Sequence, residues 1–305
     1  MTKELKLGYK DLTWLGHAFE NLSIISPMKL IQVQGFDESD KQELIDKGVV
    51  GDDNRILPAC HPMLETVAEA NQYVETIFRR GPIKARRMQL GTEAANVSVT
   101  YTEDGIEMIH PGNPQGMLQF LKEYTGGSKL TGGDLDLNLP PADMVLFASV
   151  CDLYRRAVLA AYSNEAVFLY DGFSADDLLK ASNETRNNSQ GLTFHIMALT
   201  KPGIRFESDE VEKILSSFVE QKLLKQEKGR YFPIGEAVLF AGNFLVIENS
   251  LDVVVGQVHD NLLYRSGFTV LQAGPLDLVM LEGSEESVTL QCLSAKSILS
   301  IMSSI

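Results

Sequence analysis

Residues 35–58, GFDESDKQELIDKGVVGDDNRILP, contain the pattern that decides the fold. Acidic residues surround Ser39, an apolar pair follows at Leu44 and Ile45, and a polar turn then separates two short apolar runs. Carboxylates and a serine ahead of an apolar run are typical of a helix start, because they satisfy free backbone N–H groups and the helix dipole. The stretch therefore predicts a helix followed by a two-stranded ribbon.

The same order of features returns in residues 205–233, RFESDEVEKILSSFVEQKLLKQEKGRYFP. An apolar pair at 223–224 takes the place of the pair at 49–50, and RYFP at 230–233 takes the place of RILP at 55–58. One residue added to the second turn brings the two patterns into register. Self-similarity of this kind predicts an internal repeat, with one topology on both sides of the chain.

Further helices are expected ahead of each copy, since apolar residues there recur at helical spacing. The expected ranges are about 10–23, 27–34, 142–162 and 174–183. Three helices followed by a two-stranded ribbon is the layout of a winged helix-turn-helix. The repeat argument thus predicts that residues 30–124 and 200–304 share this layout.

A linker is expected between the copies at residues 125–141, TGGSKLTGGDLDLNLPP, because two Gly-Gly pairs and a Pro-Pro pair interrupt the pattern. We therefore predict a first α+β repeat at residues 1–124 and a second at residues 142–305. Each is expected to hold a winged-helix-like helical segment, an antiparallel sheet and a closing helix.

The segment that follows each ribbon differs between the copies. In the first, helical spacing behind Pro62 predicts a helix. Its apolar positions are Met63, Val67, Ala70, Val74 and Ile77. In the second, residues 235–249 are apolar nearly all round, and periodicity alone leaves both a buried helix and a strand open.

Strands are expected next in both copies. In the first, the alternation of VSVTY at 97–101 and the turn at Asp104-Gly105 predict a hairpin with one solvated face. In the second, the expected strands are 262–271, 276–281 and 288–293. A closing helix should follow, because its apolar residues fall on one stripe: Ile298, Ile301, Met302 and Ile305.

Composition narrows the class of protein. The chain has 305 residues, 44% hydrophobic and 22% charged, which is typical of a folded globular protein. No apolar run is long enough for a bilayer span, the N-terminus lacks a secretory pattern, and the three cysteines are far apart. We therefore expect a cytoplasmic protein with reduced thiols. A net charge of -14 disfavours nucleic acid and anionic membranes as partners.

The sequence holds no pattern that predicts catalysis. Five histidines stand apart without metal-ligand spacing, and no nucleophile elbow, phosphate loop or dinucleotide fingerprint occurs. The glycine pairs at 126–127 and 132–133 lack the Lys and the helix that a phosphate cradle requires. We therefore expect no cofactor, no metal and no enzymatic activity.

One basic cluster interrupts the acidic chain: Arg79, Arg80, Lys84, Arg86 and Arg87. In a winged-helix regulator such a cluster could contact DNA phosphates. The helix expected to enter each ribbon is acidic, however, whereas DNA readers place cations on that helix. We therefore interpret the arginines as paired within the protein or as a site for an acidic protein partner.

A second candidate surface lies in the expected strand 262–271. Tyr264, Phe268 and Val270 share one face, while Leu263 and Leu271 lie on the other, so one covering helix cannot bury both. Two interpretations remain: the uncovered face packs inside the protein, or it is left for a helix of a partner. In the second case the aromatic pair would anchor the partner.

The order of these parts resembles the EspG family, the cytosolic chaperones of type VII (ESX) secretion systems. The resemblance lies in LIDKGVV at 44–50, Asp53, the expected helix through Met63 to Arg80 that ends in FRRG, and the hairpin VSVTYTEDGIEMI at 97–109. It covers about a third of the chain. Lysine use and the long linker depart from the mycobacterial pattern, which indicates a distant Gram-positive counterpart.

The resemblance implies an adaptor that binds the helical tips of secreted substrates and keeps them soluble before export. Such a protein needs an accessible apolar surface with a polar rim and no catalytic pocket. A winged-helix DNA-binding regulator and another kind of protein-interaction scaffold remain as alternatives.

Overall fold

The computed structural model describes residues 2–33, 38–92, 94–184, 189–200, 204–274 and 276–304. It is an α+β fold built on antiparallel sheet, which confirms the predicted class. The chain divides into two compact units. Unit 1 comprises 1–121, 251–267 and 303–305, and unit 2 comprises 122–250 and 268–302.

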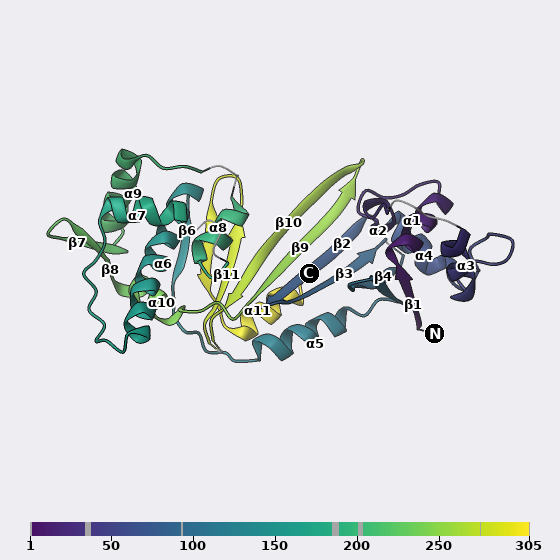
Figure 1. The fold of residues 1–305 in the computed structure, drawn as a ribbon, viewed down its shortest axis with the longest axis horizontal. Helices are drawn as coiled ribbons and strands as arrows, with labels where there is room; N and C mark the ends of the chain where they lie inside the picture. The colour runs from purple at the N-terminus through teal and green to yellow at the C-terminus, as the bar shows by residue number, and fades with distance from the viewer. Residues whose placement is uncertain are drawn as a thin grey trace. The chain divides into compact units, whose positions relative to one another are not determined.

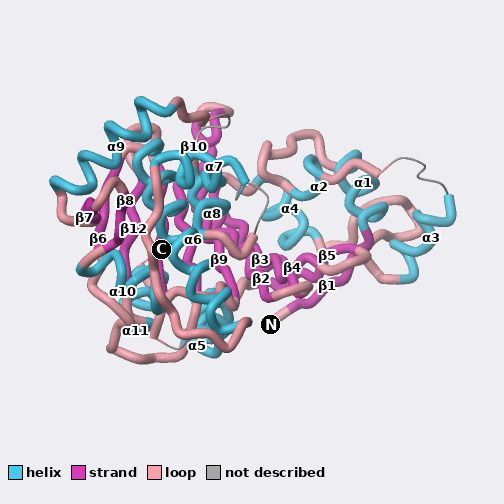
Figure 2. The backbone as a smooth tube through the Cα atoms, turned by 60° about the vertical axis from the view of Figure 1, so that its left-hand side comes forward, coloured by secondary structure: helices cyan, strands magenta, loops and turns pink. Residues whose placement is uncertain are grey.

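Unit 1 places four helices against one face of an antiparallel sheet. Its helices are α1 (Tyr9–Ala18), α2 (Pro27–Leu30), α3 (Glu38–Asp46) and α4 (His61–Glu69). Its strands are β1 (Lys3–Gly8), β2 (Gln72–Arg80), β3 (Ile83–Gly91), β4 (Asn96–Tyr101), β5 (Gly105–His110) and most of β9 (Asn249–His259), in the order β1-β5-β4-β3-β2-β9. Figure 2 shows α1, α2 and α4 on one side of strands β1 to β5.

The core of unit 1 follows from strand alternation. Alternate residues of each strand point to the helices, so Leu90, Val97 and Met108 meet Leu12 and Leu64 in one buried cluster. The turn at Asp104 joins β4 and β5 as predicted, and Leu5 of β1 lies opposite Met108. Helix α5 (Pro114–Thr125) begins in this unit and runs into the next.

Unit 2 has the larger set of helices. They are α6 (Pro141–Ser163), α7 (Ala175–Glu184), α8 (Leu192–Leu199), α9 (Ser208–Glu220), α10 (Gly235–Asn243) and α11 (Ala295–Met302). The sheet has the order β10-β11-β12-β6, from β10 (Leu262–Gln272), β11 (Leu278–Gly283), β12 (Val288–Cys292) and β6 (Asp136–Leu139); β7 (Leu224–Glu227) and β8 (Arg230–Pro233) form a separate ribbon. Strand β10 contributes its first six residues to unit 1 and its last five to unit 2.

The long helix α6 organises unit 2, because almost its whole first half is buried. Phe147 of α6 packs edge-on against Phe218 of α9, with ring centroids 6.1 Å apart. The same cluster includes Leu271, Leu281 and other alternate residues of the sheet.

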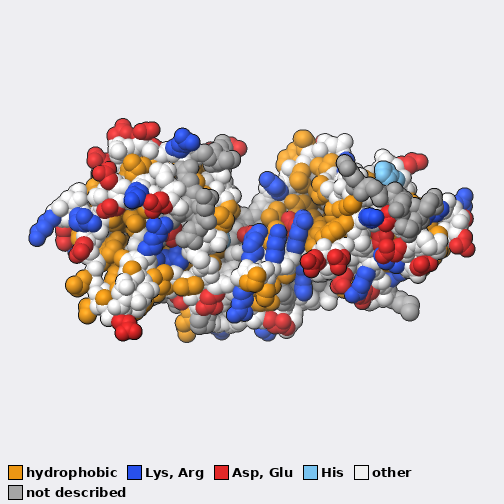
Figure 3. All heavy atoms as spheres, viewed as in Figure 1, with side chains coloured by type: hydrophobic (Ala, Val, Ile, Leu, Met, Phe, Trp, Pro, Cys, Tyr) orange, Lys and Arg blue, Asp and Glu red, His pale blue; other side chains and the backbone are white. Residues whose placement is uncertain are grey.

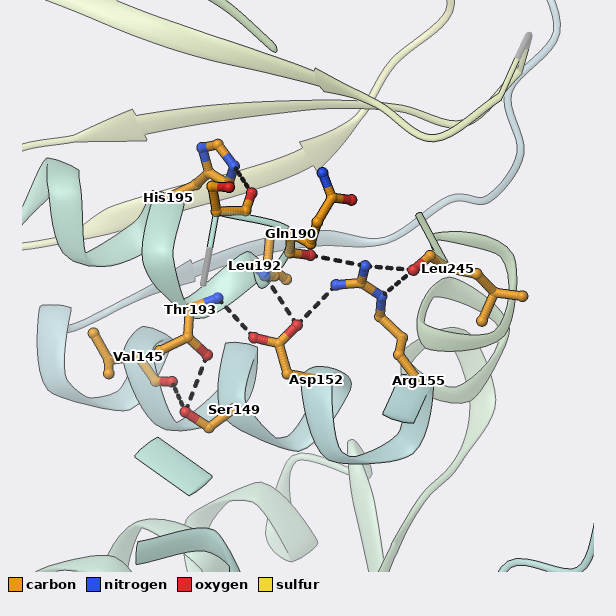
Figure 4. Close-up of polar contacts among 10 residues, drawn as sticks. Val145, Ser149, Asp152, Arg155, Gln190, Leu192, Thr193, His195 and Leu245 are labelled. Atoms are coloured by element: carbon orange, nitrogen blue, oxygen red, sulfur yellow. Dashed lines mark hydrogen bonds and ion pairs between the residues drawn. The ribbon is translucent and has the colours of Figure 1, made fainter. Parts of the chain in front are cut away.

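A buried ion pair ties three segments of unit 2 together (Figure 4). Asp152 of α6 accepts hydrogen bonds from the backbone N–H groups of Leu192 (2.9 Å) and Thr193 (3.0 Å), at the N-terminus of α8. Arg155, one turn later, donates to Asp152 (2.8 Å) and to the carbonyl oxygens of Gln190 and Leu245. The pair therefore caps α8 and holds the segment after α10.

The two halves of the chain present their elements in a similar order. A strand and a first helix are followed by further helices, a ribbon or bridge, a helix, four strands and a final helix. In the first half β1 pairs with β5, and β5, β4, β3 and β2 follow in turn; in the second β6 pairs with β12, and β12, β11, β10 and β9 follow. Helix α8, an addition in the second half, was not predicted.

The predicted helix from Met63 to Ile77 is wrong in its second half. Helix α4 ends at Glu69, and Val74 and Ile77 lie in β2. The strand buries Tyr73 on one face and Phe78 on the other, so its apolar residues do not alternate. That spacing coincides with a helical one, and the FRR of the resemblance is strand.

The structure also answers expectations about residues 235–249, the linker and the closing helix of the second half. Residues 235–243 are helix α10, which decides between the two alternatives, and β9 begins at Asn249. Strand β6 lies inside the stretch expected to be a linker. Ile305 of the closing stripe lies outside the described residues, whereas Ile298 and Met302 are buried in α11.

Candidate partner-binding surface

The face of the unit 1 sheet that packs on the helices changes character along its strands. Tyr73 belongs to the core, but further along the same face Ile77 lies opposite Arg86 and Arg79 lies opposite Lys84. Charged residues at every second position, on the same face as Tyr73, show that the helices no longer cover the sheet there. This end of the face is therefore half-exposed or exposed in unit 1.

Two of the arginines are paired across strands. Arg86 donates to Glu75 and its guanidinium lies 4.0 Å from the centre of the Tyr101 ring, while Arg79 pairs with Asp252 of β9. Burial raises the pKa of Tyr101, and the charge of Arg86 acts in the opposite direction. The guanidinium groups are thus held in place, with planar faces and hydrogen-bonding edges in fixed positions.

Strand β10 extends this face. Burial raises the pKa of the Tyr73 phenol, and the charge of Arg265 acts in the opposite direction, so Arg265 lies near this ring. Leu263 lies two residues earlier and shares the side of Arg265 by strand alternation. We call the following residues the arginine patch: Glu75, Ile77, Arg79, Lys84, Arg86, Tyr101, Asp252 and Arg265. Figure 3 shows Lys and Arg side chains gathered over β2 and β3, with acidic side chains beside them.

The start of β10 is the most apolar exposed strand segment of unit 1. Leu262, Leu263 and Tyr264 are 59%, 40% and 58% exposed. They follow a tight turn at Asp260 and Asn261, both in the left-handed region that such hairpin turns require. We call these three residues the hairpin end.

The predicted basic cluster divides between two faces. Arg79, Lys84 and Arg86 share the helix side of the sheet, whereas Arg80 and Arg87 occupy the alternate positions and point to the other side. The expectation of internal pairing agrees with the partners of Arg79 and Arg86.

The predicted apolar face of β10 becomes buried along its length. Tyr264 is exposed, Phe268 is half-buried, and Val270 is only 2% exposed. Tyr264 belongs to unit 1, and Phe268 and Val270 belong to unit 2. Tyr264 is therefore the member of this set that is best placed to meet a partner.

Sequence reasoning missed several residues of the surface, among them Ile77, Tyr101 and Asp252. Each lies in a strand or register that was not predicted or not paired from sequence. The alternation Glu75, Ile77, Arg79 was a usable signal, but it becomes visible only when residues 72–80 are assigned to a strand.

Other kinds of site find little support in the described ranges. No group of three or more His, Cys, Asp or Glu side chains there could hold a metal ion. Among the helices that the structure describes, none is long and apolar enough to span a bilayer.

Comparison with known proteins gives a match at the level of structure. A scan against models of protein families finds no match, and neither does a search of curated proteins. One similar solved structure is that of the Mycobacterium tuberculosis type VII secretion system chaperone EspG5 in complex with the PE25-PPE41 dimer. The TM-score is 0.52 at 9% sequence identity, over 99% of this chain and 95% of the other. The chain therefore has the EspG fold, and the resemblance seen in the sequence is confirmed at that level.

We expect DNA binding to be weak and insensitive to sequence. Two arginines of the basic cluster are already paired with carboxylates, and α9 exposes Asp209, Glu210 and Glu212 where a recognition helix would carry cations. Fluorescence anisotropy with a random duplex at 0.15 M salt measures this, and a Kd no tighter than about 1 µM is expected. A submicromolar Kd would favour the DNA-binding regulator instead.

Proposed function

We propose that this protein is a chaperone or adaptor for a protein client of a type VII secretion system, and that it acts by binding and not by catalysis. The observation that carries the proposal is the agreement of fold over nearly the whole length of both chains with a chaperone solved in complex with a protein dimer. The client is proposed to be a helical secreted substrate, bound in the cytoplasm before export.

The proposed binding surface is the arginine patch together with the hairpin end. Aromatic residues and arginines are enriched in protein interfaces, where an apolar centre is surrounded by polar groups. Three consecutive exposed apolar residues at the hairpin end place side chains on both faces of the strand. A client that covers them must reach around the hairpin, as the tip of a helical pair could.

Charge adds a preference for part of the client. Lys84 and Arg265 are exposed cations of the patch on a chain whose net charge is -14. They would attract acidic side chains on the client helices, while the rest of the chain repels other acidic proteins. Arg80 and Arg87, on the other face, are left out of the proposed site.

The architecture is proposed to be two copies of one winged-helix-like α+β unit, at residues 1–124 and 142–305, with strand β6 of the joining stretch 125–141 belonging to the second copy. The shared order of elements and of strand pairings supports this. So do the single bridge between Val50 and Ile56 after α3 and the ribbon β7–β8 after α9, which occupy equivalent places.

The test is co-expression with the helical proteins encoded beside the gene, followed by size-exclusion chromatography of the purified mixture. A stable complex is expected with at least one of them. Arg265→Glu should weaken it about tenfold, as a reversed interface charge does, whereas Arg80→Glu on the opposite face should not. Absence of any complex would overturn the proposed function. Equal effects of the two variants would overturn the proposed binding face.

A further inference from the structure

The loop between α6 and α7 belongs to unit 2 (Figure 1). It carries the two least buried large apolar residues among those described. Val167 is 84% exposed and Leu169 is 80% exposed. The residues between and after them, Phe168 and Tyr170, are half-buried. The segment VFLY thus alternates outward and inward side chains as a β-strand does, although none of the described strands pairs with it.

The inward side chains hold this segment in place. Phe168 and Tyr170 both contact Tyr154 of α6 edge-on, with ring centroids 5.5 Å and 4.8 Å apart. Tyr170 also meets Phe232 of β8 at 6.1 Å. Aromatic pairs in this geometry stabilise beyond the area that they bury. The outward position of Val167 and Leu169 is therefore set by packing on their neighbours.

Both ends of the segment are tied to regular structure. The Ala166 N–H donates to the carbonyl of Ala161 at the end of α6, at 2.9 Å. Arg230 of β8 donates through Nε to the carbonyl of Asp171 (2.6 Å), and Phe173 exchanges two backbone hydrogen bonds with Tyr231. Between these ties, the backbone groups of residues 167–170 make no hydrogen bond with any part of the chain that the structure describes.

We infer that residues 166–171 form a docking edge for an extended segment of a second protein, which would add to it as a strand. Addition of a strand supplies partners for the free backbone groups, and it removes Val167 and Leu169 from water when the added strand carries apolar residues at alternate positions. This site shares no residue with the arginine patch, and it does not depend on the proposed chaperone function.

Charge identifies the partner strand further. Glu165 and Asp171 bracket the segment and are exposed. A second copy of this chain, paired antiparallel about Phe168, would place Glu165 opposite Asp171 at both ends, and like charges in that position destabilise strand pairs. The occupant is therefore a strand of another protein, apolar at alternate positions and with Lys or Arg at each end.

The test uses two fluorescein-labelled peptides, KTVTVTVTK and its charge-reversed control ETVTVTVTE, titrated with the full chain. The lysine peptide is expected to bind, and the control at least about tenfold more weakly. Glu165→Gln with Asp171→Asn should lower the affinity for the lysine peptide about threefold to tenfold and reduce its salt dependence. Val167→Thr with Leu169→Thr should lower it about tenfold through lost apolar contact.

Because all four positions are exposed, these variants are expected to have the same melting temperature as the unaltered chain, and a melting curve checks this. Hydrogen exchange should show slower exchange for alternate amides in residues 167–170 only when the lysine peptide is present, since one side of a strand pairs at a time. Absence of binding, equal binding of the two peptides, or no change in amide protection would overturn the docking edge. Client binding at the arginine patch should be the same in every variant. A negative result with the peptides would therefore overturn the docking edge and not the chaperone proposal, which the co-expression experiment tests.

Discussion

Asp152→Ala is expected to destabilise unit 2 by about 3–5 kcal/mol, the largest effect that we predict for a single substitution. The change leaves the Arg155 guanidinium buried without its counter-charge, and it removes the acceptor of two backbone N–H groups at the start of α8. A buried polar group without a partner lowers the stability of the fold, because it has given up its hydrogen bonds to water and gained none in return. Urea unfolding followed by circular dichroism measures the loss.

The next arginine along α6 provides the matched control. Arg156 pairs with Glu184 at 3.8 Å, and the two side chains are 42% and 53% exposed. Arg156→Ala should therefore cost no more than about 1 kcal/mol. Asp152→Ala together with Arg155→Met should be less harmful than the single change, because it also removes the buried charge. If Asp152→Ala and Arg156→Ala unfold at the same urea concentration, the buried pair does not stabilise unit 2.

The helices were the part of the fold that sequence predicted best. Acidic starts at Ser208 and Ser39, the apolar spacing of α6 and the apolar stripe of α11 all depend on residues close in sequence. The same holds for the β4–β5 hairpin, because a short turn joins two strands that follow each other in the sequence.

Strands that bury both faces could not be predicted in the same way. In β2, Tyr73 and Phe78 are buried on opposite sides, and in β9 Leu251, Val253 and Gly256 are buried without strict alternation. Burial on both faces depends on elements distant in sequence, so a period-2 pattern is lost. The predicted helix to Ile77 failed for this reason.

The candidate surface was predictable in composition but not in geometry. The cluster of arginines is plain in the sequence, yet its division into two faces depends on the register of β2 against β3. Likewise the alternation of β10 indicated that Tyr264, Phe268 and Val270 share a face. That their exposure falls along the strand depends on what packs against it, which alternation does not show.

Tyr264→Ala is expected to weaken client binding by about 1–4 kcal/mol with little change in melting temperature. Tyr264 is more than half exposed, so its truncation removes few contacts within the chain. In the proposed complex the ring would be covered by the client, and a buried aromatic is the kind of anchor on which interfaces depend most. Isothermal titration with a client identified by co-expression measures the affinity.

The neighbours of Tyr264 on β10 separate binding from folding. Val270→Ala, at a buried position, should lower the melting temperature and leave the affinity of the folded protein unchanged, and the half-buried Phe268→Ala should fall between the two. Leu263→Ala probes the side of the strand that Arg265 shares, and a client that reaches around the hairpin end should lose affinity with it as well, by less than with the aromatic. If Tyr264→Ala binds the client as tightly as the unaltered chain does, the hairpin end is not the anchor. Loss of affinity in Leu263→Ala alone would then restrict the client to the face of the arginine patch.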